Sequence, residues 1–183
     1  MTNHLDEPER IEWQGKFITA RTRGKWEYVT RARGIRAAVI LAIDADDHVL
    51  LVEQYRVPLG KACLELPAGL IGDDDSAPDE HPAQAAAREL EEETGYRATR
   101  IEVIGEFYSS PGMVSESFTL VRAHGLTRVG PGGGTEAEDI TVHRIALAHL
   151  PQFVEMARAR GLGIDVRLLM LLAPGILTSS LRA

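Results

Sequence analysis

The stretch RELEEETG, residues 88–95, decides the fold, and it carries an unusual density of charge. The apolar pattern around it predicts a helix from about Pro82 to Thr94, because Pro82 suits a first helical turn and Gly95 suits a left-handed cap. Four glutamates fall in the last turns of this helix. Like charges three or four residues apart destabilise a helix by about 0.2–0.5 kcal/mol per pair, and glutamates near the C-terminus also oppose the helix dipole. An ordinary solvated acidic face fits this arrangement poorly.

On a helix that advances about 100° per residue, the four glutamates lie on two different flanks. Leu90 is then the centre of a stripe of small residues suited to close packing on a sheet, which are Ala83, Ala86, Ala87 and Thr94. Glu89, Glu92 and Glu93 share one flank of that stripe. Glu91 falls on the opposite flank. Three carboxylates on one edge become favourable if a divalent cation neutralises them, and oxygen ligands suit Mg²⁺ or Mn²⁺ better than zinc.

Composition and charge limit the classes of function. The 183 residues, 44% hydrophobic and 26% charged, predict a single globular domain, with room for a small appendage. A formal net charge of −7 argues against a general nucleic-acid binder, although a bound metal can still bring a nucleotide to an acidic site. Cys63 is the single cysteine and lies in an apolar run, which favours a buried structural thiol in a reducing, cytoplasmic setting. No apolar run approaches the roughly 20 residues that span a membrane.

Along the chain, strand signals outnumber helix signals. Residues 1–10 are expected to form a loose tail. Two strand-like stretches around Gly24 then predict a hairpin within residues 13–31. Further strands are expected at residues 37–43, 49–55, 100–108, 117–124 and 140–145, and residues 63–66 form a short apolar segment. A helical pattern returns at residues 150–172, broken by a Gly-Leu-Gly motif, so the order predicts an α/β fold, an α/β/α sandwich with a mixed central sheet plus an N-terminal β-hairpin region.

The helix and the segment before it resemble the Nudix box. Glu80, seven residues, and then the pattern Arg-Glu-Leu-x-Glu-Glu-x-Gly-Tyr at 88–96 match its second half in full. The first half differs, because the family spacing places Asp74 where the box has glycine. Gly69 is interpreted as the box glycine, with a five-residue insertion in the acidic loop that follows. The alternative assigns the first box acid to Asp75, which leaves the role of Glu80 open.

The resemblance implies a metal-dependent hydrolase that cleaves a nucleoside diphosphate linked to another moiety. On it, the backbone carbonyl of Ala68 and the carboxylates of Glu89, Glu92 and Glu93 hold Mg²⁺, with Mn²⁺ as the other candidate. Glu92 and Arg88 are counted among the catalytic residues, and Arg88 holds neighbouring carboxylates in place.

Features outside the box narrow the substrate. LELPAGLI, residues 64–71, resembles the segment before the box in ADP-ribose pyrophosphatases. EQYR resembles their strand whose arginine, here Arg56, contacts the diphosphate or the phosphate of the terminal ribose, the plain alternative being a surface arginine. A Ser-Pro-Gly motif ending at Gly112 follows Gly95 at the spacing of that subgroup, so Gly112 is expected to bind substrate. These matches imply hydrolysis of ADP-ribose to AMP and ribose 5-phosphate.

The loop after residues 129–134 carries the expected base. Residues 129–134, VGPGGG, are expected to be flexible enough to close over substrate. On the resemblance, Glu136 or Glu138 positions or deprotonates the attacking water. A solvated acidic loop is the plain alternative for both.

The N-terminal hairpin resembles the adenine-binding segments of dimeric ADP-sugar enzymes. On that basis Phe17 and Trp26 stack on adenine. Glu27 hydrogen-bonds the base edge, and Arg31 meets the phosphates. Ordinary sheet packing is the alternative for the two aromatic residues.

The same resemblance divides the chain at residue 36. Residues 1–36 are expected to serve dimerisation and adenine stacking, and residues 37–183 to form the Nudix catalytic domain. A homodimer acting on a small nucleotide sugar is expected, with neither nucleic acid nor membrane as partner. Two other functions stay open, a pyrophosphatase for another nucleotide sugar such as GDP-mannose and a non-catalytic ADP-ribose sensor. Sensors of this fold tend to lose box carboxylates, whereas this chain keeps three.

Overall fold

The computed structural model describes residues 7–32, 35–72, 80–135 and 138–179. The strands are β1 (Glu9–Gln14), β2 (Ile18–Arg23), β3 (Trp26–Arg31), β4 (Arg36–Ala42), β5 (His48–Arg56), β6 (Lys61–Glu65), β7 (Ala68–Ile71), β8 (Tyr96–Arg97), β9 (Arg100–Tyr108), β10 (Ser117–His124), β11 (Thr127–Arg128), β12 (Ile140–Ala146) and β13 (Gly163–Ile164). The helices are α1 (Pro82–Thr94), α2 (Leu150–Ala159) and α3 (Leu169–Ser179), with 3₁₀ turns η3 (Val57–Leu59), η4 (Leu147–His149) and η5 (Val166–Leu168).

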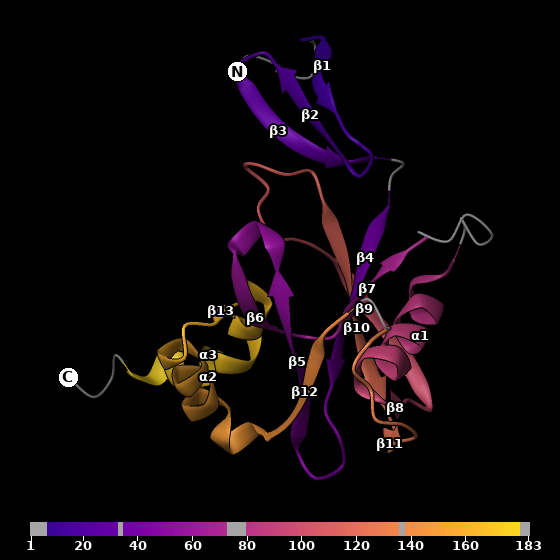
Figure 1. The fold of residues 1–183 in the computed structure, drawn as a ribbon, viewed down its shortest axis with the longest axis vertical. Coiled ribbons are helices and arrows are strands. Elements are labelled where there is room, and N and C mark those ends of the chain that lie inside the picture. The colour runs from indigo at the N-terminus through magenta and orange to yellow at the C-terminus, as the bar shows by residue number, and fades with distance from the viewer. Residues whose placement is uncertain (1–6, 33–34, 73–79, 136–137, 180–183) are drawn as a thin grey trace.

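Two mixed four-stranded sheets form the middle layer. Their strand orders are β7-β4-β10-β9 and β12-β5-β6-β13. The pairs β4–β10 and β6–β13 are parallel and the others are antiparallel. Figure 1 shows α1 on one side of these strands and α2 with α3 on the other. The α/β/α arrangement predicted from the sequence is confirmed, with the difference that the central layer is divided into two sheets.

Strand β4 supplies both hydrophobic cores, because its two faces are covered by different helices. Ala38, Ile40 and Ala42 pack in one cluster with Leu90 of α1. Val39, which points to the opposite face, packs in a second cluster that includes residues of α2 and α3. This is why residues 37–43 are continuously apolar instead of alternating.

Helix α1 begins and ends where its sequence signals predict. The ring of His81 accepts a hydrogen bond from the backbone N–H of Ala83 at 3.2 Å, and Gly95 caps the other end at φ 73°. The predicted packing stripe is displaced, however. Ala87 is exposed, whereas Ala85 and Glu93 are buried, so the packed face is centred near Ala86, between Leu90 and Glu93.

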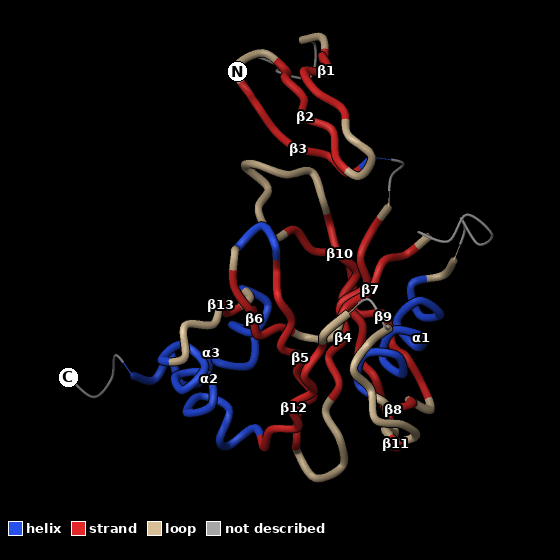
Figure 2. Tube along the Cα trace, viewed as in Figure 1, coloured by secondary structure: helices blue, strands red, loops and turns tan. Residues whose placement is uncertain are grey.

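The N-terminal region is a three-stranded sheet, not a hairpin alone. The predicted hairpin is β2 and β3, and β1 adds a third antiparallel strand that begins at Glu9. The expected loose tail over residues 1–10 is therefore wrong for its last two residues. The residues of β1 are exposed along the whole strand, so the sequence has no buried apolar pattern that would predict it. Figures 1 and 2 show the sheet beyond one end of the main body.

The N-terminal sheet contacts the main body through the loop before β10. The backbone N–H of Val29 donates to the carbonyl of Met113, and the N–H of Ser115 donates to the carbonyl of Val29, both at 3.0 Å. The chain break predicted in the C-terminal helical region is confirmed, since α2 and α3 are separated by β13 and η5. No helix in the described part of the chain is long and apolar enough to span a membrane.

Candidate active site

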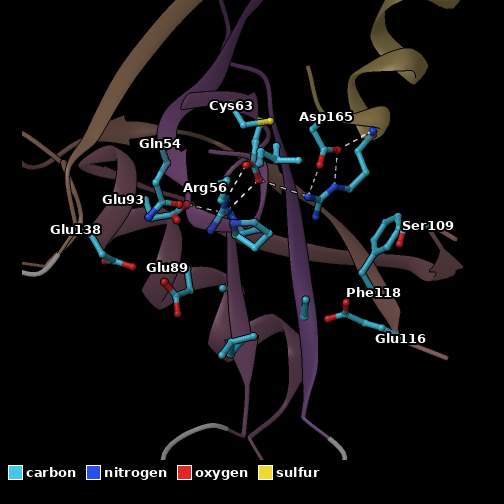
Figure 3. A pocket seen from close by; sticks show the side chains of 18 of the residues that line it. Gln54, Arg56, Cys63, Glu89, Glu93, Ser109, Glu116, Phe118, Glu138 and Asp165 are labelled. Atoms are coloured by element: carbon cyan, nitrogen blue, oxygen red, sulfur yellow. Dashed lines mark hydrogen bonds and ion pairs between the residues drawn. The ribbon is translucent and has the colours of Figure 1, made fainter. Parts of the chain in front are cut away.

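A cavity of about 610 Å³ opens between the two central sheets, beside the last turns of α1. Its lining has six carboxylates and three arginines, a formal excess of three negative charges: Glu65, Glu89, Glu93, Glu116, Glu138, Asp165, Arg31, Arg56 and Arg167. Figure 3 shows Glu89, Glu93 and Glu138 on one side of the cavity and Asp165 on the other. We call Glu89, Glu93 and Glu138 the carboxylate end, and Arg56, Glu65, Asp165 and Arg167 the arginine end.

Glu93 is the most deeply placed carboxylate of the carboxylate end. It is 4% exposed, and its Oε2 accepts a hydrogen bond from the backbone N–H of Ala68 at 2.9 Å. Burial raises the pKa of Glu93 to about 8, the Ala68 N–H opposes that rise, and the nearby carboxylates of Glu89 and Glu138 add to it. The helix therefore holds at its packed face a carboxylate whose charge lacks a full counterion.

Glu89 lies against the backbone of β7. A Cβ atom placed on Gly69 would overlap the Cγ of Glu89, so only glycine allows this approach. Burial raises the pKa of Glu89, and Arg88 opposes the rise. The close contact gives the interpreted box glycine, Gly69, a steric role without requiring an unusual backbone conformation.

Arg88 connects the carboxylates beside the cavity. Its Nη1 donates to Glu89 Oε1 at 2.7 Å and to Glu92 Oε2 at 3.4 Å. Its Nη2 donates to Glu80 Oε2 and to the Leu70 carbonyl, both at 3.4 Å. Burial opposes the charged guanidinium, but the neighbouring carboxylates outweigh it and raise the pKa of Arg88. Neither Arg88 nor Glu92 lines the cavity.

The contact between Glu80 and Arg88 helps to decide which residue is the first acid of the Nudix-like box. A carboxylate at position 80 reaches the box arginine, which fits the interpretation with an insertion before Glu80. Asp75, the alternative, lies outside the described residues. Glu91 points away, as its place on the helix predicted, and pairs with Arg97 at 2.8 and 2.9 Å.

The glycine-rich segment at 129–134 is docked on the C-terminus of α1, so the expected flexible loop is wrong. The N–H groups of Gly133 and Gly134 donate to the carbonyls of Glu93 and Glu92 at 2.8 and 3.0 Å. A Cβ on Gly132 would overlap the backbone of Thr94. Glycines are needed here for close approach to the helix end and for left-handed φ angles, not for mobility.

This docking brings Glu138 to the cavity. Its Oε2 accepts hydrogen bonds from the N–H and the hydroxyl of Thr135 at 3.0 and 3.1 Å. Figure 3 shows the Glu138 side chain near those of Glu89 and Glu93. Glu136, the other expected base, lies outside the described residues.

The arginine end is internally neutralised. Arg56 donates from Nε and Nη2 to the two oxygens of Glu65 at 2.7 and 2.9 Å. Arg167 donates to Glu65 at 3.5 Å and makes a two-point contact with Asp165 at 2.6 and 2.5 Å. Hydrogen bonding to Glu65 raises the pKa of Arg56, so the guanidinium group stays protonated. Two guanidinium groups and two carboxylates balance in this end of the cavity.

The substrate-binding residues expected in the N-terminal region and in the Ser-Pro-Gly motif lie in different places. Arg31 reaches the main cavity, where its Nε donates to Glu116 at 2.6 Å. Trp26 and Gly112 line a second cavity of about 240 Å³ between β3 and the loop before β10. Phe17 is 60% exposed, Glu27 is exposed, and neither lines any of these cavities.

The carboxylate end fits a divalent cation. A buried carboxylate with a strongly raised pKa, two others beside it, and an excess of negative charge in the lining are relieved by a hard cation with oxygen ligands. Glu89, Glu93 and Ala68 all line this end of the cavity. Among the described residues, no group of three or more His, Cys, Asp or Glu side chains is arranged so that it could hold a metal ion as placed, so a cation here would need backbone oxygen, water or substrate ligands as well. Glu92 is turned to Arg88 instead.

Sequence reasoning missed most of the arginine end. Glu65 was hidden in an apolar run, and Asp165 and Arg167 lie about a hundred positions further along the chain. Glu116 was also missed. A weak signal was present, because a charged residue inside LELPAG is costly to bury unless it is paired. The partner could not be chosen from the sequence.

Known proteins resemble this chain in sequence and fold. The model of the NUDIX domain family matches residues 33–158. An uncharacterised Nudix hydrolase of Schizosaccharomyces pombe is 33% identical over 87% of this chain and 80% of its own length. An ADP-ribose pyrophosphatase of Bacillus subtilis is 40% identical, over 50% of this chain and 46% of its own length. The crystal structure of an ADP compounds hydrolase matches with a TM-score of 0.67 and 25% identity, covering 94% of this chain and 93% of that one.

These similarities agree with the geometry of α1. The matched region contains the whole box helix, β7 with Gly69 and the docked glycine segment, and Nudix enzymes generally use a divalent metal. The family inferred from RELEEETG is confirmed: the chain belongs to the Nudix hydrolase family.

Proposed function

We propose that this protein hydrolyses the diphosphate bond of ADP-ribose, or of a closely related ADP-sugar, to AMP and ribose 5-phosphate with Mg²⁺ as cofactor. Mn²⁺ is the other cation that the ligand chemistry allows. The observation that carries the proposal is the meeting of Glu89, Glu93 and Glu138 with Arg56 in one cavity. The names of the Bacillus subtilis pyrophosphatase and the ADP compounds hydrolase support the choice of substrate.

The carboxylate end supplies the cation site and the base. Glu89, Glu93 and the Ala68 carbonyl would hold Mg²⁺, which when bound neutralises the diphosphate and the charge that develops on it. Arg88 keeps Glu89 oriented through the 2.7 Å hydrogen bond. Glu138, which lines the cavity, would accept a proton from water, and Glu136 stays a second candidate.

The arginines supply fixed positive charge. Arg56 is held at two points by Glu65, so it meets a phosphate without first losing much side-chain freedom. Arg31 enters the cavity from β3 and pairs with Glu116, which a phosphate can replace as its partner. Both roles agree with their expected contact to phosphate.

Adenine binding and dimerisation are assigned to residues 1–36, and the Nudix catalytic domain to residues 37–183. Trp13, Phe17 and Trp26 are all more than half exposed in this protomer. Aromatic residues left exposed on one sheet are typical of a surface covered by a partner or a base. A homodimer would place them against a second copy and complete the adenine site. A stable, fully active monomer in a sizing experiment would contradict the dimer.

A substrate panel tests the function. ADP-ribose, ADP-glucose and GDP-mannose are compared at equal Mg²⁺ by chromatography of the nucleotide products. We expect the highest kcat/KM for ADP-ribose, with AMP as the product. Preference for GDP-mannose would indicate a GDP-mannose pyrophosphatase instead. Binding of ADP-ribose without turnover would indicate a non-catalytic sensor.

Two matched variants identify the site. Glu93→Gln removes a carboxylate from the cavity, while Glu91→Gln removes one from the opposite face of the same helix. We expect Glu93→Gln to lower kcat by at least about a thousand-fold, because several kcal/mol of cation-mediated stabilisation are lost. Normal turnover by folded Glu93→Gln would show that the site assignment is wrong.

A further inference from the structure

We propose that Arg167 is a second phosphate-binding arginine, which together with Arg56 holds the phosphate that stays with the sugar half of the substrate. The inference rests on the proposed function, because it assigns the two ends of the same cavity. Arg56 is the last residue of β5, and Arg167 lies in η5 near the end of the chain. The fold brings them together on one carboxylate, Glu65.

The two guanidinium groups lie side by side. Nη2 of Arg56 and Nη2 of Arg167 both donate to Oε2 of Glu65, at 2.9 and 3.5 Å. Glu65 is 3% exposed, whereas the arginine side chains keep 40% and 18% of their surface accessible. The carboxylate therefore lies behind the arginines, and the arginines face the cavity.

Both arginines keep donors for a ligand. A guanidinium carries five N–H groups, and the bonds to Glu65 and Asp165 use only Nε and Nη2. Within the described residues, Nη1 of Arg56 and Nη1 of Arg167 have no hydrogen-bond acceptor. Two neighbouring NH₂ groups directed by fixed forks suit the oxygens of a phosphate.

Asp165 and Phe118 position Arg167. Asp165 accepts from the Nε, the Nη2 and the backbone N–H of Arg167, the last at 2.7 Å. The guanidinium carbon lies 5.6 Å from the centre of the Phe118 ring. Since the side chain is already held, little of its freedom remains to be lost when a phosphate binds.

The arrangement along the cavity assigns the phosphate. Figure 3 shows Arg56 between the carboxylate end on one side and Asp165 on the other. Arg31 comes from β3, the strand that also carries Trp26, so it serves the phosphate next to adenosine. Arg56 and Arg167 belong to the main body and share Glu65, so they serve the phosphate on the sugar side.

Binding of the two products tests this assignment without catalysis. Ribose 5-phosphate and AMP are titrated separately by calorimetry in EDTA, with wild type, Arg167→Lys and Arg167→Gln. Loss of the fork should weaken ribose 5-phosphate at least about ten-fold and leave AMP within about two-fold. Arg144→Lys is the matched control, because Arg144 forms a similar fork with Asp44 and Asp46 outside this cavity.

Each other outcome overturns the inference. Unchanged ribose 5-phosphate affinity in folded variants, weakened AMP alone, or equal weakening of both products means that Arg167 does not hold the sugar-side phosphate. No binding of ribose 5-phosphate to wild type has the same meaning. Arg167→Lys keeps the charge beside Asp165, and melting temperatures identify any loss of fold. Failure of the proposed function is separate, because it shows as no hydrolysis of ADP-ribose by wild type.

Discussion

Both ends of the cavity contain buried carboxylates, but their charges are neutralised by the chain at one end and not at the other. At the arginine end, every buried charge has a partner from the chain itself. At the carboxylate end, three acids share one space, and burial raises the pKa of Glu93 to about 8. One end is complete as folded, whereas the other is arranged for a cation that the chain does not supply. A charged residue in this cavity can therefore stabilise the fold or weaken it, according to the end at which it lies.

A large effect on stability at neutral pH is expected from removing the shared anion of the arginine end. Glu65→Gln leaves Arg56 and Arg167 beside each other without their common carboxylate. Breaking a buried ion pair in this way costs about 3 kcal/mol, the low end of the usual range because Arg56 is partly hydrated. Urea unfolding measures it. A loss below about 0.5 kcal/mol would mean that this end is not internally balanced.

A glutamate-to-glutamine substitution at the carboxylate end, Glu93→Gln, should increase the free energy of unfolding when metal is absent. Because the pKa of Glu93 rises from 4.5 to about 8 on folding, its favourable contribution is full below about pH 4.5 and is lost as pH rises towards 8. In EDTA, wild type should lose up to about 1.4 kcal/mol per pH unit across this window. Glu93→Gln should flatten the curve and be the more stable protein at pH 8. Parallel curves in urea unfolding would contradict the imbalance.

A smaller effect is expected from filling the space beside Glu89. Gly69→Ala places a Cβ on the Glu89 side chain, and such overpacking costs about 1–3 kcal/mol. Displacement of Glu89 should also lower kcat. Gly130→Ala is the matched control, because a Cβ there has its nearest neighbour at 3.9 Å. Equal melting temperatures and kcat values for both variants would remove the steric role of Gly69.

The smallest effect is expected at Glu91. It shares the helix and the charge of the site residues but pairs with Arg97 at the surface. Glu91→Gln should leave kcat, KM and melting temperature within experimental error, because exposed pairs contribute little. A strong loss of activity would mean that the helix faces were assigned wrongly.

Local signals made the core of this fold predictable. The bounds of α1 follow from Pro82, from Gly95 and from the apolar spacing between them, all within one short segment. Strand β1 was missed because its residues are exposed and only pairing with β2 makes it a strand. The strands β7 and β13 are short, and like β1 they are strands only because they pair with another strand.

The candidate site divides in the same way. The carboxylates of α1 were separable by helical geometry, and the isolation of Glu91 followed from its position on the helix. The arginine end was not predictable, because Glu65 and Arg167 are 102 residues apart and meet only through folding. The glycine segment was misjudged for a related reason. Glycines that allow mobility and glycines that allow close backbone contact look identical in a sequence.

That docked segment also sets a distance. Hydrogen bonds from Gly133 and Gly134 fix one end of the connection on the last turn of α1, and β12 fixes the other end at Ile140. Surface loops usually tolerate insertions, but this one sets the distance between the C-terminal end of α1 and Glu138. Adding or deleting a single residue between Gly134 and Glu138 would therefore move that carboxylate relative to Glu89 and Glu93, so the length of this segment matters as well as its glycines.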